Sequence, residues 1–245
     1  MILPLLLMLQ AAGPTENADA RAVRCADLAT ADPARGLAEA SSWRLAGGSF
    51  LARSCEGLAY AAQAKFEAAA SAFEAAARGA EIAKDARAPT YWAQTGNAWL
   101  AAGEPGKARS ALDAAVSAGG LSGLALGEAY LDRARAAVAA GDNGGARADI
   151  DRALATAKDD PLAWLLSATL ARRTGDLTRA KRDIAEALTR AADDASVQLE
   201  AGNIAALDKD EAGARAAWQR AVTLGRDGAV AASARQALAQ FQAGK

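Results

Sequence analysis

The apolar residues of this chain recur with the period of a helix, in pairs of segments joined by short turns. In one such pair, Trp164, Ala168 and Ala171 stand at i, i+4 and i+7 and form one apolar face. Gly175 ends this helix, and Asp176 is placed to cap the next one. The second helix has its own apolar face, made by Ala180, Ile184, Ala187 and Leu188. The pattern predicts two antiparallel helices that cross closely at small residues.

The turn between the two helices recurs at nearly fixed spacing. Its copies are Gly103-Glu104-Pro105-Gly106-Lys107-Ala108, Gly141-Asp142-Asn143-Gly144-Gly145-Ala146, Gly175-Asp176-Leu177-Thr178-Arg179-Ala180 and Lys209-Asp210-Glu211-Ala212-Gly213-Ala214. The last three closing alanines are 34 residues apart, and the first step is 38. Such a period is typical of a solenoid, in which each unit buries its apolar face against its neighbours. We predict an all-α solenoid of about five helix hairpins that begin near residues 50, 89, 127, 161 and 195.

Composition supports helices and argues against catalysis. Hydrophobic residues are 52% of the chain and prolines number only six. Alanine, the best helix former, dominates. Histidine is absent, which removes the commonest general base and the commonest metal ligand. We therefore expect no catalytic residue, no cofactor and no metal site, and no enzyme activity of the chain's own.

The charge balance narrows the class of partner. The net charge is −1, with 28 basic and 29 acidic residues. Neither a nucleic acid nor a membrane surface is an expected partner at this balance. We expect a protein or peptide partner.

The N-terminus has the pattern of an export signal. An apolar run covers residues 2–9, which is too short to span a bilayer. Ala18-Asp19-Ala20 forms an A-x-A site, so cleavage would leave Arg21 as the first residue. No Lys or Arg precedes the apolar run, and the alternative is an uncleaved segment in a cytoplasmic protein. Taking residues 1–20 as a signal predicts a periplasmic or secreted protein with no stable membrane span after its removal.

The two cysteines agree with export. Cys25 and Cys55 are the only ones in the chain. In an oxidising compartment they would close a loop of about 30 residues and add ~3 kcal/mol of stability. The alternative is two buried thiols in a reduced protein.

The repeats resemble the tetratricopeptide repeat family over about residues 50–226. The resemblance rests on the aromatic, small and bulky positions of each first helix, such as Trp92, Gly96 and Trp99, together with the Gly-Asp turns and the second-helix spacing. It implies a right-handed superhelix whose first helices form a concave wall that binds peptides or extended segments. The repeats depart from the family at one position, just before the small residue of each first helix. The family usually has leucine there, and the five repeats of this chain have Glu56, Thr95, Arg133, Ser167 and Ala201.

Both ends of the array are predicted to be capped, since solenoids need polar ends. Residues 21–49 form an N-terminal capping segment with a helix over Pro33 to Leu45. Residues 227–245 form a C-terminal cap with a helix over Ala229 to Phe241. A Cys25–Cys55 bridge would fasten the N-terminal cap to the first repeat.

The stripe next to the buried face of each first helix gives the candidate groove residues. These are Asn97, Arg135, Arg172, Arg173 and Asn203. An asparagine amide both donates and accepts hydrogen bonds, and an arginine can hold a carboxylate through two of them. The alternative is a set of solvated side chains, with arginines that favour helix ends or pair at i,i+4.

These features predict a non-catalytic scaffold or adaptor that binds a peptide segment in its groove, in the periplasm and in a process such as envelope assembly. One alternative is an accessory subunit of an envelope enzyme complex. Another is a self-associating structural protein, joined through exposed groove residues such as Leu131, Leu165 and Leu199. The expected state is a monomer or a weak homo-oligomer.

Overall fold

The structure is a computed structural model that describes residues 17–243. Those residues form thirteen α-helices and no strand. The helices are α1 (Ala18–Ala31), α2 (Pro33–Leu45), α3 (Phe50–Ala62), α4 (Phe66–Ile82), α5 (Ala88–Ala101), α6 (Pro105–Ser117), α7 (Gly123–Ala139), α8 (Asn143–Thr156), α9 (Pro161–Arg173), α10 (Leu177–Arg190), α11 (Ala195–Leu207), α12 (Glu211–Gly225) and α13 (Ala229–Ala243).

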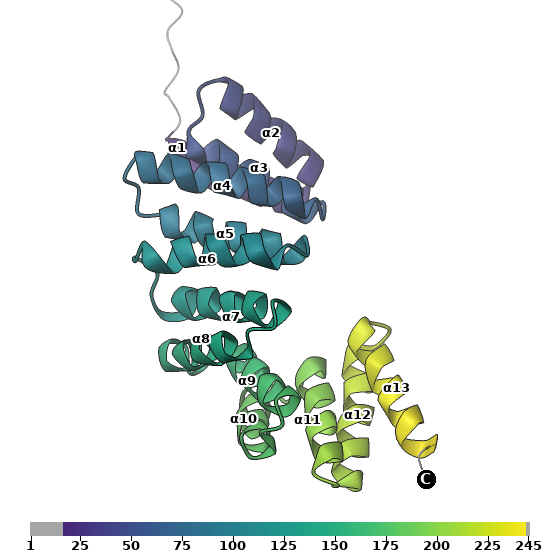
Figure 1. The fold of residues 1–245 in the computed structure, drawn as a ribbon. Helices are drawn as coiled ribbons and strands as arrows, with labels where there is room; N and C mark the ends of the chain where they lie inside the picture. Colours follow the sequence, from purple (N-terminus) through teal and green to yellow (C-terminus); the bar gives the residue numbers. More distant parts are fainter. Residues whose placement is uncertain (1–16, 244–245) are drawn as a thin grey trace, which may run out of the picture.

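Consecutive helices pack as antiparallel hairpins, and the hairpins stack on one another (Figure 1). The pairs are α3/α4, α5/α6, α7/α8, α9/α10 and α11/α12. The stack changes direction at α9, so that α11–α13 form an arm that stands away from α3–α8. The predicted all-α solenoid is confirmed.

The recurring turn motif works as a helix stop followed by a helix start. Gly141 and Gly175 adopt φ of +79° and +85°, which costs glycine little. The carboxylates of Asp142 and Asp176 then accept hydrogen bonds from backbone N–H groups three residues on, at 2.8 and 3.0 Å. In these two copies the motif therefore ends one helix and caps the next.

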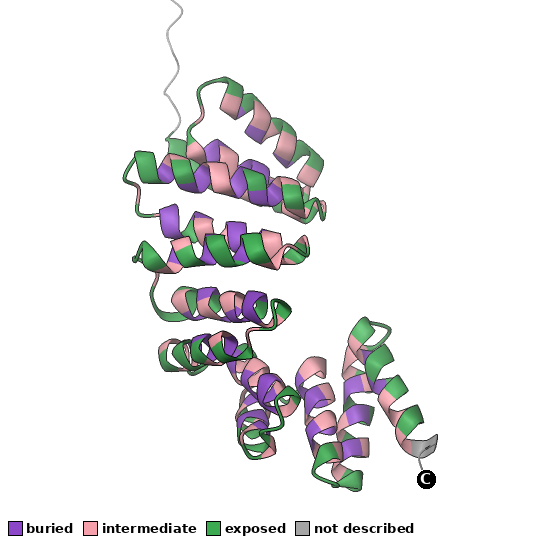
Figure 2. Cartoon of the chain, in the orientation of Figure 1, coloured by how far each residue is buried: buried purple, intermediate pink, exposed green. Residues whose placement is uncertain are grey.

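Small residues let the paired helices approach closely, and the buried positions run along the facing sides of each pair (Figure 2). Gly96 faces Leu112, and a Cβ at Gly96 would lie 2.4 Å from Leu112 Cγ. Gly202 faces Trp218 in the same way, also at 2.4 Å. Any larger residue at these crossings would force the helices apart.

The position that departs from the family's leucine is buried or half-buried, and each polar side chain there has a local partner. Glu56, 5% exposed, accepts from Arg44 at 2.9 Å. The guanidinium of Arg133 donates to both carboxylate oxygens of Asp149, at 2.8 and 2.7 Å. This contact raises the pKa of Arg133. The departures are therefore compensated within the chain.

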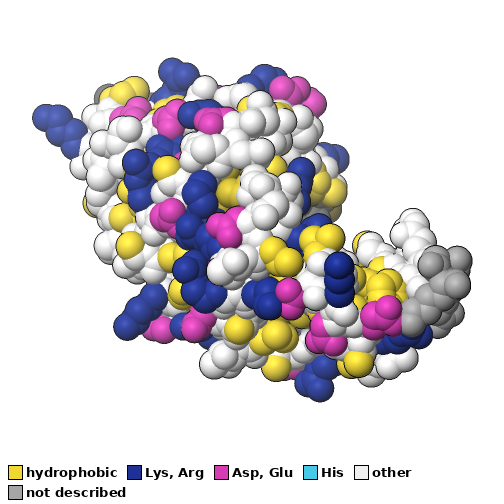
Figure 3. Space-filling model, turned by 60° about the horizontal axis from the view of Figure 1, so that its bottom comes forward, with side chains coloured by type: hydrophobic (Ala, Val, Ile, Leu, Met, Phe, Trp, Pro, Cys, Tyr) yellow, Lys and Arg dark blue, Asp and Glu magenta, His cyan; other side chains and the backbone are white. Residues whose placement is uncertain are grey.

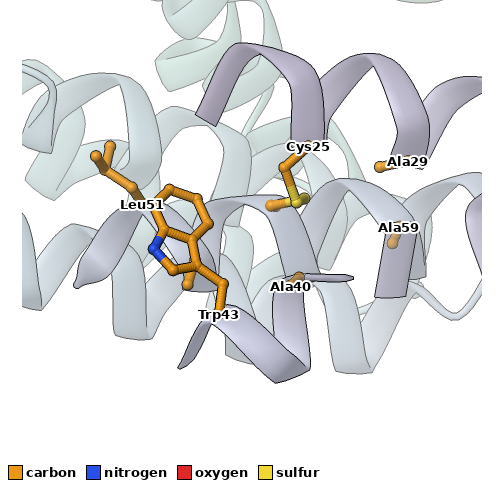
Figure 4. Packing of buried hydrophobic residues seen from close by; sticks show 8 residues of the cluster. Cys25, Ala29, Ala40, Trp43, Leu51 and Ala59 are labelled. Atoms are coloured by element: carbon orange, nitrogen blue, oxygen red, sulfur yellow. A yellow bond between two sulfur atoms is a disulfide. The ribbon is translucent and has the colours of Figure 1, made fainter. Parts of the chain in front are cut away.

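The N-terminal helices α1 and α2 pack on α3 around a small core (Figure 4). A disulfide joins Cys25 of α1 to Cys55 of α3, with 5.9 Å between their Cα atoms. Trp43 of α2 lies beside it in the same cluster. On the outside of this cluster, Arg21 pairs with Glu39 at 2.7 Å and lies over the Trp43 ring.

The predicted export signal has two parts near the N-terminus, the apolar run and the A-x-A site. The apolar run at residues 2–9 lies outside the described residues. The Ala18-Asp19-Ala20 sequence forms the first turn of α1. Within residues 17–243, no helix combines the length and the apolar character that crossing a membrane requires.

In the loop before α5, the carboxyl group of Asp85 has a lowered pKa. The side chain of Arg87 donates to Asp85 at 2.7 and 2.6 Å, and its backbone N–H donates at 2.9 Å. These bonds lower the pKa of Asp85 from 3.8 to about 2. A carboxyl with a lowered folded-state pKa stabilises the fold above its unfolded pKa, and this contribution is lost as pH falls from about 3.8 to about 2.

We expect Arg87→Gln to raise the pKa of Asp85 towards 3.8, because the guanidinium bonds to the carboxylate are lost. An NMR titration of the Asp85 carboxyl carbon measures this directly. Arg78→Gln is the control, since Arg78 pairs with Glu74 on α4 and should leave Asp85 unchanged. A wild-type Asp85 that titrates near 3.8 would contradict the assignment.

Candidate functional site

The first helices of successive hairpins form an inner wall, which we define as α5, α7, α9 and α11, because each of them contacts the next. The five predicted groove residues all come from these helices. Asn97 lies on α5, Arg135 on α7, Arg172 and Arg173 on α9, and Asn203 on α11. The structure does not gather them at one point. It divides them into groups, each with different local partners.

Asn97 and Arg135 meet through a residue that sequence reasoning did not single out. Asp132 accepts a hydrogen bond from Asn97 Nδ2 at 2.9 Å and pairs with Arg135 at 3.0 Å. The carboxylate thus ties α5 to α7 along the wall. Both Asn97 and Arg135 remain exposed, so this link leaves hydrogen-bonding groups available to a partner.

Arg172 and Asn203 belong to a second group that is largely satisfied within the chain. Glu200, 6% exposed, accepts from Arg172 Nε at 2.6 Å and from Asn203 Nδ2 at 3.2 Å. Asn203 Oδ1 in turn accepts from Trp218 Nε1 at 3.1 Å. Because a buried carboxylate already balances Arg172, that arginine is poorly suited to bind a carboxylate from a partner.

Arg173 differs from Arg172 although the two are adjacent. Its side chain is exposed and makes no ion pair or side-chain hydrogen bond with the described residues. It lies with Arg135 at a hollow of about 170 Å³ between α7 and α9. The other residues that line the hollow are Ala134, Val138, Ile150, Leu166, Thr169 and Leu170. Two arginines therefore flank an apolar depression in the inner wall.

A second, larger recess lies towards the C-terminal end of the wall, with a volume of about 560 Å³. It is lined by Arg172, Asn203, Ala206, Leu207, Trp218, Ala237, Gln240 and Phe241. Trp218 and Phe241 meet edge to face, with ring centroids 5.4 Å apart. Leu207 is 56% exposed, so this recess offers apolar surface next to the neutralised Arg172–Glu200 pair.

The apolar groove residues expected to support self-association are not equally available. Leu131 is 1% exposed and packs in the core with Ala134 and Ile150, because α7 turns this side chain towards its partner helix. The expectation that Leu131 is exposed is wrong. Leu165 and Leu199 are half-buried against neighbouring helices.

Asp132 and Glu200 are the wall residues that sequence reasoning missed. Each stands three residues before a predicted groove residue, Arg135 and Asn203 respectively, and helix residues three apart are neighbours. From that spacing, the contacts of Asp132 with Arg135 and of Glu200 with Asn203 could have been predicted from the sequence. The contact from Glu200 across to Arg172 on another helix had no such signal.

The described residues contain no group of three or more Cys, Asp or Glu side chains placed to hold a metal ion. Acidic and basic side chains are interleaved on the face shown in Figure 3, without a large patch of one sign. The wall can therefore offer hydrogen bonds, two cations and apolar hollows, which suits an extended polypeptide.

Comparisons with known proteins agree with the fold. The sequence matches a family model described as tetratricopeptide repeat over residues 56–122, 131–180 and 165–229. No curated protein matches the sequence.

Several solved structures share the fold. PilW, a widely conserved type IV pilus biogenesis factor, has a TM-score of 0.73 at 16% identity, over 91% of this chain and 99% of its own. PilF of Pseudomonas aeruginosa has a TM-score of 0.70 at 13% identity, over 94% and 100%. YrrB, a repeat protein with an unusual peptide-binding site, has a TM-score of 0.55 at 17% identity, over 80% and 96%. At these identities the likeness establishes the fold alone.

Proposed function

Because the chain belongs to the tetratricopeptide repeat family, we propose that it is a non-catalytic scaffold that binds an extended protein segment along its inner wall. The observation that carries this is the wall itself. It presents the exposed polar groups of Asn97 and Arg135, the cation of Arg173, which has no partner among the described residues, and two recesses with apolar side chains in their lining. Such a surface has room for the alternating side chains of an extended segment.

We place the protein in the periplasm, where it serves an assembly process of the envelope. The N-terminal apolar run and A-x-A site support export. The disulfide between Cys25 and Cys55 suits an oxidising compartment. The fold is also that of PilW, a pilus biogenesis factor. The partner in this proposal is a protein of the same compartment.

Site-specific photocrosslinking in the native host tests the proposal. A photoreactive phenylalanine derivative at Leu207, which is exposed in the C-terminal recess, should crosslink a second protein in the periplasmic fraction. The same group at Asn97 should crosslink the same protein. At Ala185, on the exposed side of the outer helix α10, it should give no such product.

The outcomes separate the functions. Crosslinks only to a second copy of the chain would replace the adaptor by a self-associating protein. Equal crosslinking from Ala185 would show that the inner wall is not the binding surface. Absence of any product from Leu207 and Asn97 would overturn the proposal.

A further inference from the structure

We infer that the hollow between α7 and α9 is an anchor site for one aliphatic side chain of the bound segment, with a neighbouring Asp or Glu of that segment held by Arg173 and Arg135. This inference rests on the proposed function and specifies the chemistry of its partner. It concerns the hollow alone. The larger recess near α13 differs because the aromatic rings of Trp218 and Phe241 line it.

The size of the hollow selects a single side chain. Its volume is about 170 Å³, whereas sites for small molecules and cofactors usually occupy about 300 to 1,000 Å³. Its walls are the aliphatic side chains of Val138, Ile150, Leu166 and Leu170, and none of the described aromatic rings lines it. Leucine, isoleucine, valine or methionine is therefore the expected occupant.

The charges beside the hollow select an acidic neighbour. Arg173 has no partner among the described residues, and Arg135 has one, Asp132. Two positive charges and one negative charge thus leave an excess of one positive charge beside an apolar surface. Arginine binds carboxylates through paired hydrogen bonds, and such bonds strengthen where apolar side chains exclude water. A basic neighbour would be repelled.

The course of the wall favours an acidic side chain within the segment over a free C-terminal carboxylate. The hollow lies in the middle of the wall, with α5 on one side and α11 on the other. Asn97 lies in one direction, and in the other lies the recess lined by Asn203 and Leu207. A segment that fills the hollow can continue along the wall in both directions.

A library of random linear dodecapeptides displayed on phage tests the inference against the full-length purified protein. The enriched peptides should share an aliphatic residue one or two positions from Asp or Glu, away from the C-terminus. Synthetic copies of the enriched peptides, amidated at the C-terminus and labelled with fluorescein, are then measured by fluorescence polarisation. Changing the acidic residue to its amide should weaken binding at least tenfold.

Variants of the protein connect this preference to the hollow. Arg173→Glu should weaken peptide binding at least tenfold, since a repulsive carboxylate replaces the unpaired cation. Thr169→Phe should do the same by filling the hollow with a ring. Arg35→Glu is the matched control, because Arg35 is also exposed, has no side-chain partner among the described residues and lies on α2. Circular dichroism and urea unfolding verify that each variant folds.

The inference is overturned if no peptide is enriched or if the enriched peptides lack an acidic residue. It is equally overturned if binding survives both Arg173→Glu and Thr169→Phe, or requires a free C-terminus. Its failure differs from a failure of the proposed function. Crosslinks from Leu207 and Asn97 without an acidic preference would keep the scaffold and remove this anchor.

Discussion

Replacing Asp183 by alanine is expected to lower the free energy of unfolding by about 3 kcal/mol, which is typical when one partner of a buried ion pair is removed. Asp183 is fully buried on α10. Its carboxylate accepts hydrogen bonds from Ser167, from Arg179 at 3.2 Å and from Arg182 at 2.8 Å. Few positions in the described chain combine complete burial with so many donors.

The loss would extend beyond these three contacts. Arg147 of α8 donates to Ser167 at 2.9 Å, so the network ties one hairpin to the next. Burial already lowers the pKa of Arg147. Without Asp183, that guanidinium would face less negative charge, and Ser167 would lose its acceptor.

Urea unfolding followed by circular dichroism measures the effect. Glu186→Ala on the same helix is the control, because the Glu186 side chain is 44% exposed and, among the described residues, forms an ion pair with Arg190 alone, four residues on. Exposed pairs of this kind contribute about 0.3 to 0.5 kcal/mol. If Asp183→Ala cost no more than Glu186→Ala, the buried network would have no role in holding the hairpins together.

Removing the disulfide by Cys25→Ala with Cys55→Ala should destabilise the N-terminal helices by about 3.6 kcal/mol. This value is the free energy that corresponds to the loop-closure entropy of the unfolded chain for a separation of 30 residues. Alanine is preferred to serine because both cysteines are buried, at 1% and 2% exposure, where a hydroxyl would lack a partner. The wild-type protein under reducing conditions should behave like the double variant.

The effect should be confined to one end of the molecule. Each repeat of a solenoid contacts only its neighbours, so removal of the Cys25–Cys55 disulfide should not destabilise the distant repeats. Hydrogen–deuterium exchange with mass spectrometry should show faster exchange in α1–α3 and unchanged exchange in α9–α13. Equal acceleration throughout the chain would show that the solenoid unfolds as one unit and that the cap controls it.

Charge reversal at Arg172 would place a second carboxylate beside buried Glu200 and would destabilise the fold. Loss of binding in that variant would therefore say little about a partner. Arg173→Glu avoids this, because Arg173 has no internal partner among the described residues.

The sequence by itself determined the repeat architecture, because its signals are local. The Gly-Asp turns at Gly141-Asp142 and Gly175-Asp176 specify a helix stop and a cap within a few residues. The small residues at Gly96 and Gly202 mark where helices cross. These signals depend on backbone conformation and side-chain size at fixed spacing, so they could be recognised without knowledge of the fold.

Only the tertiary structure decided which wall residues are available to a partner. Arg172 and Arg173 are adjacent and identical in sequence. Glu200, 28 residues after Arg172, pairs with Arg172 and makes no such contact with Arg173. Leu131 points into the core although its position in the repeat predicted the groove. Charge balance and exposure depend on contacts between helices from different repeats, and such contacts follow from how the hairpins stack and not from the spacing within any one of them.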